Sequence, residues 1–523
     1  MTTTNSTDVL IVGAGPAGTA LAIDLARRGV AVRLIDKATH AFDGSRAKGI
    51  QPRTLEVFDD LGALPDIINQ GALYPPMGIH LGPITIPFRM MAKGRRGPDV
   101  PYPNTWLIPQ YHTDRVLHAR FESLGGRVEF DTELKEFTDH GSHVSAYVTT
   151  PAGAEHITAR YLVGADGGAS RVRKILGIEF RGTTDDADRI LIVDAAVSGG
   201  LSREYWHVWP GIKGRFVGAC PLPHSDTFQW MIRLSADEAA PQDLAQINAR
   251  VQAHTRNKRL GLHDIAWQSV FRPNIRLAAN YRRGRVLLAG DAAHVHTPAG
   301  AQGLNTGIGD AYNLGWKLGQ VLAGADDQLL NTYEQERQPI AAGVLGLSTE
   351  KYEGIGKFDP SSIRRGKDEK QLALTYHGGP LAPLASDRTA TLRVGDRAPD
   401  ADLVTKGGRR VRLFDAYRGP HFTALAYGPH AAVLADLDWP TAGAQLTRVI
   451  IDTSGKRDLP DGVFTDPTGQ FAEIYGLSRD TLFLIRPDGY IGHIAIHNIA
   501  GTTRVAAQAV APHSVEPELS KQA

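Results

Sequence analysis

The stretch DVLIVGAGPAGTALAIDLARRGVAVRLID, residues 8–36, decides the fold of this chain. It predicts a buried strand, a glycine turn, a helix and a second strand. The spacing of Gly13, Gly15 and Gly18 is typical of a turn whose backbone approaches a pyrophosphate closely. The second strand ends at Asp36, which is placed to bind a pair of ribose hydroxyls. Glycines also end helices and fill loops, but here every element of the pattern agrees, so a dinucleotide-binding unit is predicted.

The composition favours a small-molecule partner. The chain has 523 residues, too many for one hydrophobic core, and we expect about three domains. Its 57 basic and 56 acidic side chains give no electrostatic footprint for nucleic acid or for a membrane surface. No apolar run reaches the roughly 20 residues of a membrane span and no signal peptide is evident, so a cytoplasmic location is expected. The single cysteine, Cys220, excludes an internal disulfide and is expected to be a small buried hydrophobe.

A second informative stretch is LVGADGGASRVR, residues 162–173. It again predicts an apolar strand, a glycine turn and a helix. Asp166 follows the strand at its carboxyl end, where open α/β sheets place their ligands. The same aspartate could instead cap the helix that follows it. Both roles remain open at this point.

The third stretch is LAGDAAHVHTPAGAQGLNTG, residues 288–307. It predicts a buried strand that ends at Asp291 and, after a turn, a helix that begins near Gly303. The glycine-rich start of this helix offers backbone N–H groups and a positive dipole end, which suit a ring that becomes anionic on reduction. His294 and His296 lie in the turn without carboxylates or cysteines at metal-ligand spacing, so no metal site is predicted.

The segments between these stretches read differently. Residues 74–100 predict short antiparallel strands, and residues 181–281 read as alternating strand material. Arg46 lies in a polar loop, where it is either solvated or turned toward a cofactor, and Thr113 is expected to cap a helix. Four tryptophans of the second segment either wall a pocket for a flat substrate or fill the core of a sheet: Trp206, Trp209, Trp230 and Trp267.

Taken together and in this order, the three motifs resemble the signatures of class A flavoprotein monooxygenases, which have the p-hydroxybenzoate hydroxylase fold. The resemblance covers residues 8–350. It implies an α/β protein in which a Rossmann-like FAD-binding domain is interleaved with a β-sheet substrate domain. It also implies bound FAD, NADPH or NADH as a transient co-substrate, and O2. The expected reaction is hydroxylation of an aromatic substrate through a flavin C4a-hydroperoxide.

The resemblance also assigns residues to the cofactor. Arg46 and Pro298 are expected near the flavin ring, and Asp166 is expected where FAD and NAD(P)H both pass. No residue is identified as a base that would deprotonate a substrate phenol. The full cofactor set implied by the resemblance is Gly13, Gly15, Ala17, Gly18, Asp36, Lys37, Arg46, Gln110, Asp166, Asp291, Pro298, Gly303, Leu304 and Asn305.

Residues beyond 395 resemble the thioredoxin-like C-terminal domain of phenol hydroxylase and of rifampicin or polyketide hydroxylases. Where a thioredoxin would carry CxxC this chain has Gly-Pro-His-Ala, so disulfide chemistry is excluded and the domain is expected to pack, cover or form a homodimer. The predicted division is 1–73, 111–180 and 282–353 for the FAD-binding domain, 74–110 and 181–281 for the substrate domain, 354–394 for a linker, 395–505 for the thioredoxin-like domain and 506–523 for a flexible tail.

Other functions on this fold stay open. The same cofactor site could serve epoxidation, Baeyer-Villiger oxidation or the reduction of double bonds. A flavoprotein that binds an aromatic ligand without turnover is the alternative from another class. The substrate could be a phenol, a hydroxyphenyl acid or a polycyclic polyketide or antibiotic.

Overall fold

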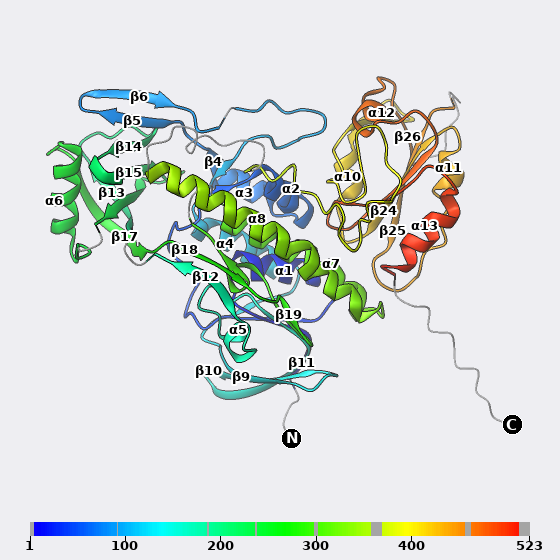
Figure 1. Cartoon of the computed structure of the whole chain (residues 1–523), viewed down its shortest axis with the longest axis horizontal. Coiled ribbons are helices and arrows are strands. Elements are labelled where there is room, and N and C mark those ends of the chain that lie inside the picture. The colour runs from blue at the N-terminus through cyan, green and yellow to red at the C-terminus, as the bar shows by residue number, and fades with distance from the viewer. Residues whose placement is uncertain are drawn as a thin grey trace.

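The computed structural model describes residues 5–91, 93–185, 188–235, 238–297, 302–356, 369–454 and 462–511. The described chain forms one eight-stranded sheet, two seven-stranded sheets and two three-stranded sheets. Figure 1 shows one seven-stranded sheet at the left end of the molecule, the eight-stranded sheet in the middle and the C-terminal sheet at the right end. The long helix α8 (Asn331–Gly356) runs diagonally across the middle of this view.

The eight-stranded sheet, called here the cofactor sheet, is built around β1 (Asn5–Val12). This strand pairs in parallel with β2 (Val32–Ile35) and β11 (Gly153–Gly164). Helix α1 (Pro16–Ala26) connects β1 to β2, which is the unit that the first stretch predicts. The other strands are β8 (Val128–Glu129), β9 (Glu133–Asp139), β10 (Val144–Thr150), β19 (Arg282–Arg283) and β20 (Val286–Leu288).

Helices cover this sheet. Helix α4 (Gln110–Ser123) begins directly after Pro109, and Thr113, expected as its cap, lies inside it. Proline fixes an extended backbone and needs no N–H partner, so the helix starts immediately behind it. The remaining helices of this region are α2 (Pro52–Leu61), α3 (Leu64–Gln70), α5 (Arg171–Ile175) and α7 (Gly303–Leu322), with 3-10 turns η2 (Gly290–Ala292) and η3 (Asp327–Leu330).

The first seven-stranded sheet is called here the substrate sheet. Its strand order is β17 (Gly261–Phe271), β13 (Arg189–Ser198), β16 (Thr227–Leu234), β15 (Phe216–Pro221), β14 (Trp206–Pro210), β5 (Met77–Leu81) and β6 (Ile84–Phe88). Strand β5 comes from the segment of short strands before α4 and pairs in parallel with β14. The 3-10 turn η1 (Ile212–Gly214) connects β14 and β15.

Helix α6 (Leu244–Thr255) lies within the segment that the sequence pattern presents as strands only, and that prediction is wrong there. The Asp243 side chain caps the helix by accepting a hydrogen bond from the Gln246 backbone N–H at 2.8 Å. Ile247 and Val251, four residues apart, are fully buried on one helical face. Figure 1 shows α6 on the outer side of the substrate sheet.

The two faces of the substrate sheet are filled differently. Phe228 and Trp230 of β16 pack with Ile247 of α6 in a closed apolar core. The alternate residues of β16 point to the opposite face, where Gln229 is buried and Met231 is half-buried. The tryptophans divide between the faces: Trp209 and Trp230 are buried in the core, and Trp206 and Trp267 are half-buried.

The C-terminal residues form the second seven-stranded sheet. Its core joins that of the cofactor region, because Phe422 packs edge-on against Trp316 of α7 at 5.7 Å between ring centroids. Helix α13 (Ile499–Gln508) continues into the stretch expected as a flexible tail. The strand order is β23 (Arg410–Arg412), β22 (Asp402–Thr405), β26 (Val463–Thr465), β25 (Leu446–Asp452), β24 (Phe422–Gly428), β27 (Thr481–Ile485) and β28 (Ile491–Ala495).

Short helices and two small sheets complete the chain. In the C-terminal region the helices are α10 (Leu413–Tyr417), α11 (Ala431–Leu434) and α12 (Gln470–Tyr475). The small sheets are β3 (Gly49–Ile50), β7 (Trp106–Leu107) and β4 (Ala72–Leu73), and β12 (Phe180–Thr184), β18 (Asn274–Ala278) and β21 (His294–Val295).

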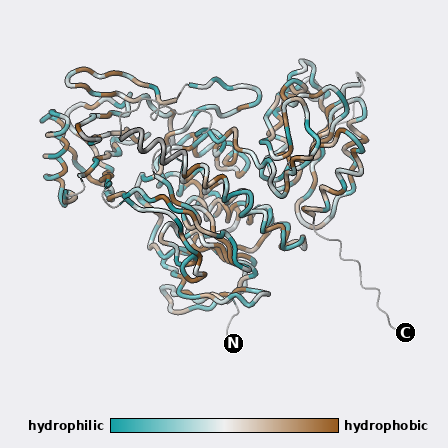
Figure 2. Tube along the Cα trace, in the orientation of Figure 1, coloured by the Kyte–Doolittle hydropathy of each residue, from teal (hydrophilic) through white to brown (hydrophobic). Residues whose placement is uncertain are grey.

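Hydrophobic residues follow the strands and hydrophilic residues the outer loops, as Figure 2 shows. The central strand of the cofactor sheet is the clearest case, since Val9, Leu10 and Ile11 are fully buried. None of the described helices combines the length and the apolar character that crossing a membrane requires.

Candidate active site

The turn between β1 and α1 is tightly packed on its inner side and open on its outer side. Gly13 has φ of +109°, and a Cβ there would stand 2.3 Å from the carbonyl oxygen of Ala165. A Cβ at Gly18 would stand 2.0 Å from the carbonyl oxygen of Gly13. At Gly15, by contrast, a Cβ would meet no heavy atom within 4 Å. The helix start has no side-chain cap, so its first backbone N–H groups are directed to this open space.

Asp36 lies beside this turn at the end of β2. Its Oδ2 accepts a hydrogen bond from the Ala14 backbone N–H at 2.8 Å, and its Oδ1 accepts one from Ala38 at 2.9 Å. Each oxygen keeps further acceptor capacity, and the side chain is only half-buried. Lys37 is exposed next to it and Ala17 is half-buried at the helix start. An uncapped helix start with an adjacent acid fits a pyrophosphate and a ribose.

Asp166 caps the helix that follows it. Its Oδ1 accepts a hydrogen bond from the Ser170 hydroxyl at 2.5 Å, and its Oδ2 accepts from the Arg171 backbone N–H at 2.6 Å. The capping role that the sequence left open is therefore present. The preceding residue, Ala165, donates its backbone N–H to Val12 at 2.7 Å, so this strand end lies against the first glycine turn.

Asp291 and Arg46 are brought together from distant parts of the chain. Protein atoms surround the Asp291 carboxylate and raise its pKa, and the positive charge of Arg46 opposes that rise. Both side chains nevertheless remain accessible to solvent. Asp291 follows a buried strand and Arg46 lies in a loop. Because both charged groups are accessible to solvent, they can bind a polar ligand.

A buried network that the sequence did not reveal holds the Asp291 turn. Asp310 of α7 accepts a hydrogen bond from the Gly290 backbone N–H at 3.2 Å, contacts His294 at 2.5 Å and pairs with Arg337 at 2.8 Å. Burial alone would raise the pKa of Asp310, but the charges of His294 and Arg337 outweigh burial and lower it. His294 therefore stabilises the Asp291 turn through its contact with Asp310.

The start of α7 fastens a neighbouring turn. Asn305 accepts a hydrogen bond from the Gln51 backbone N–H at 2.8 Å and donates one to the Gly49 carbonyl at 2.9 Å. Gly303 and Leu304 are half-buried at the helix start. Asn305 therefore positions the chain between β3 and α2, a role that the sequence did not suggest. Pro298 lies outside the described residues.

The loop of residues 42–48 joins the cofactor sheet to the substrate sheet. Phe42 lies edge-on to Trp267 of β17 at 5.5 Å between ring centroids. Ser45 donates its backbone N–H at 2.8 Å and its hydroxyl at 2.5 Å to Asp194 of β13. The next residue but one, Ala47, donates its N–H to the Gln110 side chain at 3.3 Å. The loop that carries Arg46 is thus fixed across the inner face of the substrate sheet.

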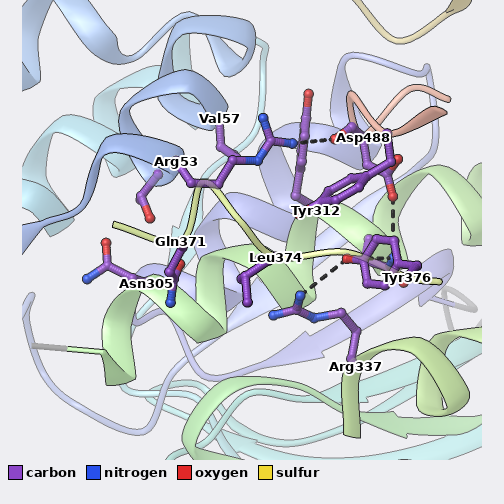
Figure 3. A pocket seen from close by; sticks show the side chains of 13 residues that line it. Arg53, Val57, Asn305, Tyr312, Arg337, Gln371, Leu374, Tyr376 and Asp488 are labelled. Carbon is purple, nitrogen blue, oxygen red and sulfur yellow. Dashed lines mark hydrogen bonds between the residues drawn. The ribbon is translucent and has the colours of Figure 1, made fainter. Parts of the chain in front are cut away.

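A separate cavity lies between α2, α7 and the C-terminal sheet (Figure 3). The space open to water is about 20 Å³, which is enough for about one water molecule. Arg53 donates to the Asp488 carbonyl at 2.6 Å, and Arg337 donates to the Tyr376 hydroxyl at 3.2 Å. This cavity is too small for an aromatic substrate and is part of the packing against the C-terminal region.

Comparison with known proteins identifies the family of this chain. The model of the FAD binding domain family matches residues 6–348. The chain belongs to this family. A flavin-dependent monooxygenase of Mycobacteroides abscessus is 42% identical to it, over 92% of this chain and 96% of the relative.

Two further relatives are named for particular ligands. The 12-dehydrotetracycline 5-monooxygenase/anhydrotetracycline 6-monooxygenase of Streptomyces rimosus is 34% identical, over 92% of this chain and 94% of that protein. A solved ternary complex of aklavinone-11 hydroxylase with FAD and aklavinone has a TM-score of 0.79 and 25% identity, and covers 97% of this chain and 99% of that one.

The protein is a FAD-dependent monooxygenase with NAD(P)H as its co-substrate, and its fold is that of FAD-dependent aromatic hydroxylases, as the resemblance predicts. The roles of individual cofactor residues and the thioredoxin-like character of the C-terminal sheet stay predictions.

Proposed function

We propose that this monooxygenase hydroxylates a polycyclic phenol that binds on the inner face of the substrate sheet, beside the loop of residues 42–48. The observation that carries this proposal is the unequal filling of the sheet's two faces. The outer face is closed by α6, whereas Trp206 and Met231 on the inner face are only half-buried. An aromatic wall with a few polar groups is typical of a site for a flat ligand. Relatives named for anhydrotetracycline and aklavinone support the same substrate class.

In this proposal the glycine turn holds the FAD pyrophosphate, Asp36 the adenosine ribose and Asp291 the ribityl chain. Arg46 and Leu304 lie beside the flavin ring. FAD, when bound, supplies the activation of O2 and the transfer of one oxygen atom. The chain contributes positioning and the exclusion of water, because the loop that carries Arg46 is fastened to the substrate sheet by Ser45.

The test uses protein reconstituted with FAD. NADH and NADPH oxidation is followed with anhydrotetracycline, aklavinone and pentachlorophenol under labelled O2, and the products are analysed by mass spectrometry. We expect one labelled oxygen atom in a product of at least one polycyclic phenol. Reductant oxidation that yields only peroxide with every probe would contradict the proposal, and a ring-inserted or reduced product would identify another reaction of the fold.

The proposed role of Asp291 has its own test. The Asp291→Asn variant should retain less FAD through gel filtration, because the amide loses the negative charge and half of the acceptor capacity. Asp43→Asn, an exposed aspartate of the loop of residues 42–48, is the matched control and should retain FAD as the wild type does. Equal FAD retention by both variants would argue against this role.

We also propose a cytoplasmic location and a homodimer. A homodimer is one of the roles expected for a C-terminal region without CxxC, beside packing and covering. Cell fractionation and light scattering of the purified protein test these two proposals.

A further inference from the structure

Lys48 is a buried lysine on the inner face of the substrate sheet, and the function proposed above does not use it. It ends the loop of residues 42–48 and is 8% exposed. Its Nζ donates a hydrogen bond to Oε1 of Gln229, and the Met231 sulfur lies 3.9 Å away. The same nitrogen stands 5.3 Å from the ring centroid of Trp206. The amine is therefore surrounded by an amide, a thioether and an indole.

Among the described residues no carboxylate forms an ion pair with Lys48. The nearest acid is Asp194, whose oxygens are bound by Ser45. Burial lowers the pKa of Lys48, while Cys220 and Asp194 raise it in part. Burial also raises the pKa of Asp194 and that of Cys220. A buried ammonium without an anion is costly, so this position favours the free amine or an anionic ligand.

The other charged groups near this cluster do not supply an anion. Arg203 lies close enough to Cys220 to affect its pKa, and Tyr111 of α4 feels the charge of Asp194. Burial raises the pKa of Tyr111, so it remains a neutral phenol. Lys48 is therefore a basic side chain on this face whose hydrogen-bond partner is an amide and not an acid.

A second donor on the same face lacks an acceptor. The indole N–H of Trp206 is buried, and within the described part of the chain it makes no hydrogen bond. Gly218 of β15 lies next to it, where an added Cβ would meet the Trp206 nitrogen at 3.5 Å and Met231 at 3.8 Å, both ordinary contacts. The Trp206 indole N–H and the Lys48 nitrogen are thus two N–H groups of this face that suit an oxygen anion on an aromatic ring.

We propose that Lys48 is the residue that deprotonates the phenolic hydroxyl of the substrate and then holds the phenolate. The substrate O–H bond breaks, an N–H bond forms on the Lys48 amine, and the electron pair stays on the oxygen and spreads into the ring. The resulting ammonium and phenolate form an ion pair. Ionisation makes the ring carbons more nucleophilic toward the oxygen donor. The inference rests on the proposed function for the substrate class only.

The experiment measures ionisation of a bound phenol by its absorption, independently of turnover. FAD-loaded wild type, Lys48→Met and Lys48→Arg are titrated with 4-nitrophenol and with anhydrotetracycline across a pH series. In the wild type the ionisation midpoint of the bound probe should lie below that of the free probe. Lys48→Met should raise the midpoint by about 1–3 pH units, because the adjacent cation is lost. Lys48→Arg should keep the low midpoint but reduce kcat, because arginine cannot accept the proton.

Lys258→Met is the matched control, since this exposed lysine lies in the connection that follows α6 and should leave the midpoint unchanged. FAD retention and thermal unfolding show whether each variant is folded, and Lys48→Arg decides the matter if Lys48→Met does not fold. Equal midpoints in wild type and variants, or binding of neither phenol, would overturn the inference. A wild type that ionises the bound probe without oxygenating any substrate would overturn the proposed function and leave the role of Lys48 standing.

Discussion

Lys48 and Lys317 are both buried lysines, but their surroundings differ. Lys317 of α7 is fully buried and pairs with Glu336 at 2.8 Å, and Glu336 pairs in turn with Arg486 of the C-terminal region at 2.7 Å. Burial lowers the pKa of Lys317 to about 8, although Glu336 opposes the shift. Both lysines lie beside an amide and an indole, but among the described residues only Lys317 also pairs with a carboxylate. The comparison separates a buried lysine that already has a charge partner from one that has no ion-pair partner among the described residues.

The largest loss of stability is expected at Glu336, the carboxylate that Lys317 and Arg486 share. Glu336→Gln should lower the free energy of unfolding by about 3–5 kcal/mol, because it leaves the buried Lys317 without its carboxylate and leaves Arg486 with Asp488 alone. Chemical denaturation of the FAD-loaded protein measures the loss. Opposite charges hold the pKa of Glu336 well below its usual range, so the stabilisation is present above pH 4 and disappears as the pH falls.

The control for this prediction is the same substitution in an exposed ion pair. Glu133 pairs with Lys135 at the surface, and Glu133→Gln should cost less than about 1 kcal/mol. If both variants lose the same small free energy of unfolding, the buried ion pairs of Glu336 do not stabilise the contact with the C-terminal region.

Asp114 of α4 is a buried acid and provides the same test as Lys48 for a group of opposite charge. It is 1% exposed, one of its oxygens has no partner in the described chain, and burial raises its pKa to about 8. Between pH 4 and pH 8 the unfolded chain releases this proton and the folded chain retains it, so stability falls as the pH rises.

Asp114→Asn should therefore match the wild type near pH 4 and exceed it by up to about 5 kcal/mol at pH 8, because the amide never ionises. Denaturation at a series of pH values measures this, with the exposed Asp43→Asn as control. A constant difference across the series would mean that Asp114 is ionised in the folded protein.

The smallest effect on stability is expected when Lys48 receives the carboxylate it lacks. Gln229→Glu should change the free energy of unfolding by less than about 1 kcal/mol, because the new attraction and the burial of a second charge offset each other. It should also raise the ionisation midpoint of bound 4-nitrophenol, since Lys48 then has an internal anion. Gln268→Glu, at an exposed position of β17, should do neither. An unchanged midpoint would contradict the anion-binding role of Lys48.

Features that depend on residues close together in the chain could be predicted from the sequence. The strand, turn and helix around Gly13 follow from local spacing, and Asp166 and Asp291 follow buried strands, so their places at strand ends were predictable. The contact between Lys48 and Gln229 joins residues 181 positions apart, and that between Asn305 and Gly49 joins residues 256 apart. No local pattern encodes such pairs. Helix α6 was missed because the surrounding strands dominate the pattern, although Asp243 and the spacing of Ile247 and Val251 were available as signals.

The ion pairs between the two ends of the chain have a consequence for its synthesis. Glu56 of α2 pairs with Arg397, and Glu336 pairs with Arg486. When residues 1–350 have left the ribosome, both glutamates belong to the FAD-binding region, but neither arginine has yet been made. In the nascent region each glutamate has one early partner, Arg53 for Glu56 and Lys317 for Glu336, and gains its second partner late. We therefore expect the interior of this region to close fully only after Arg486 has been made.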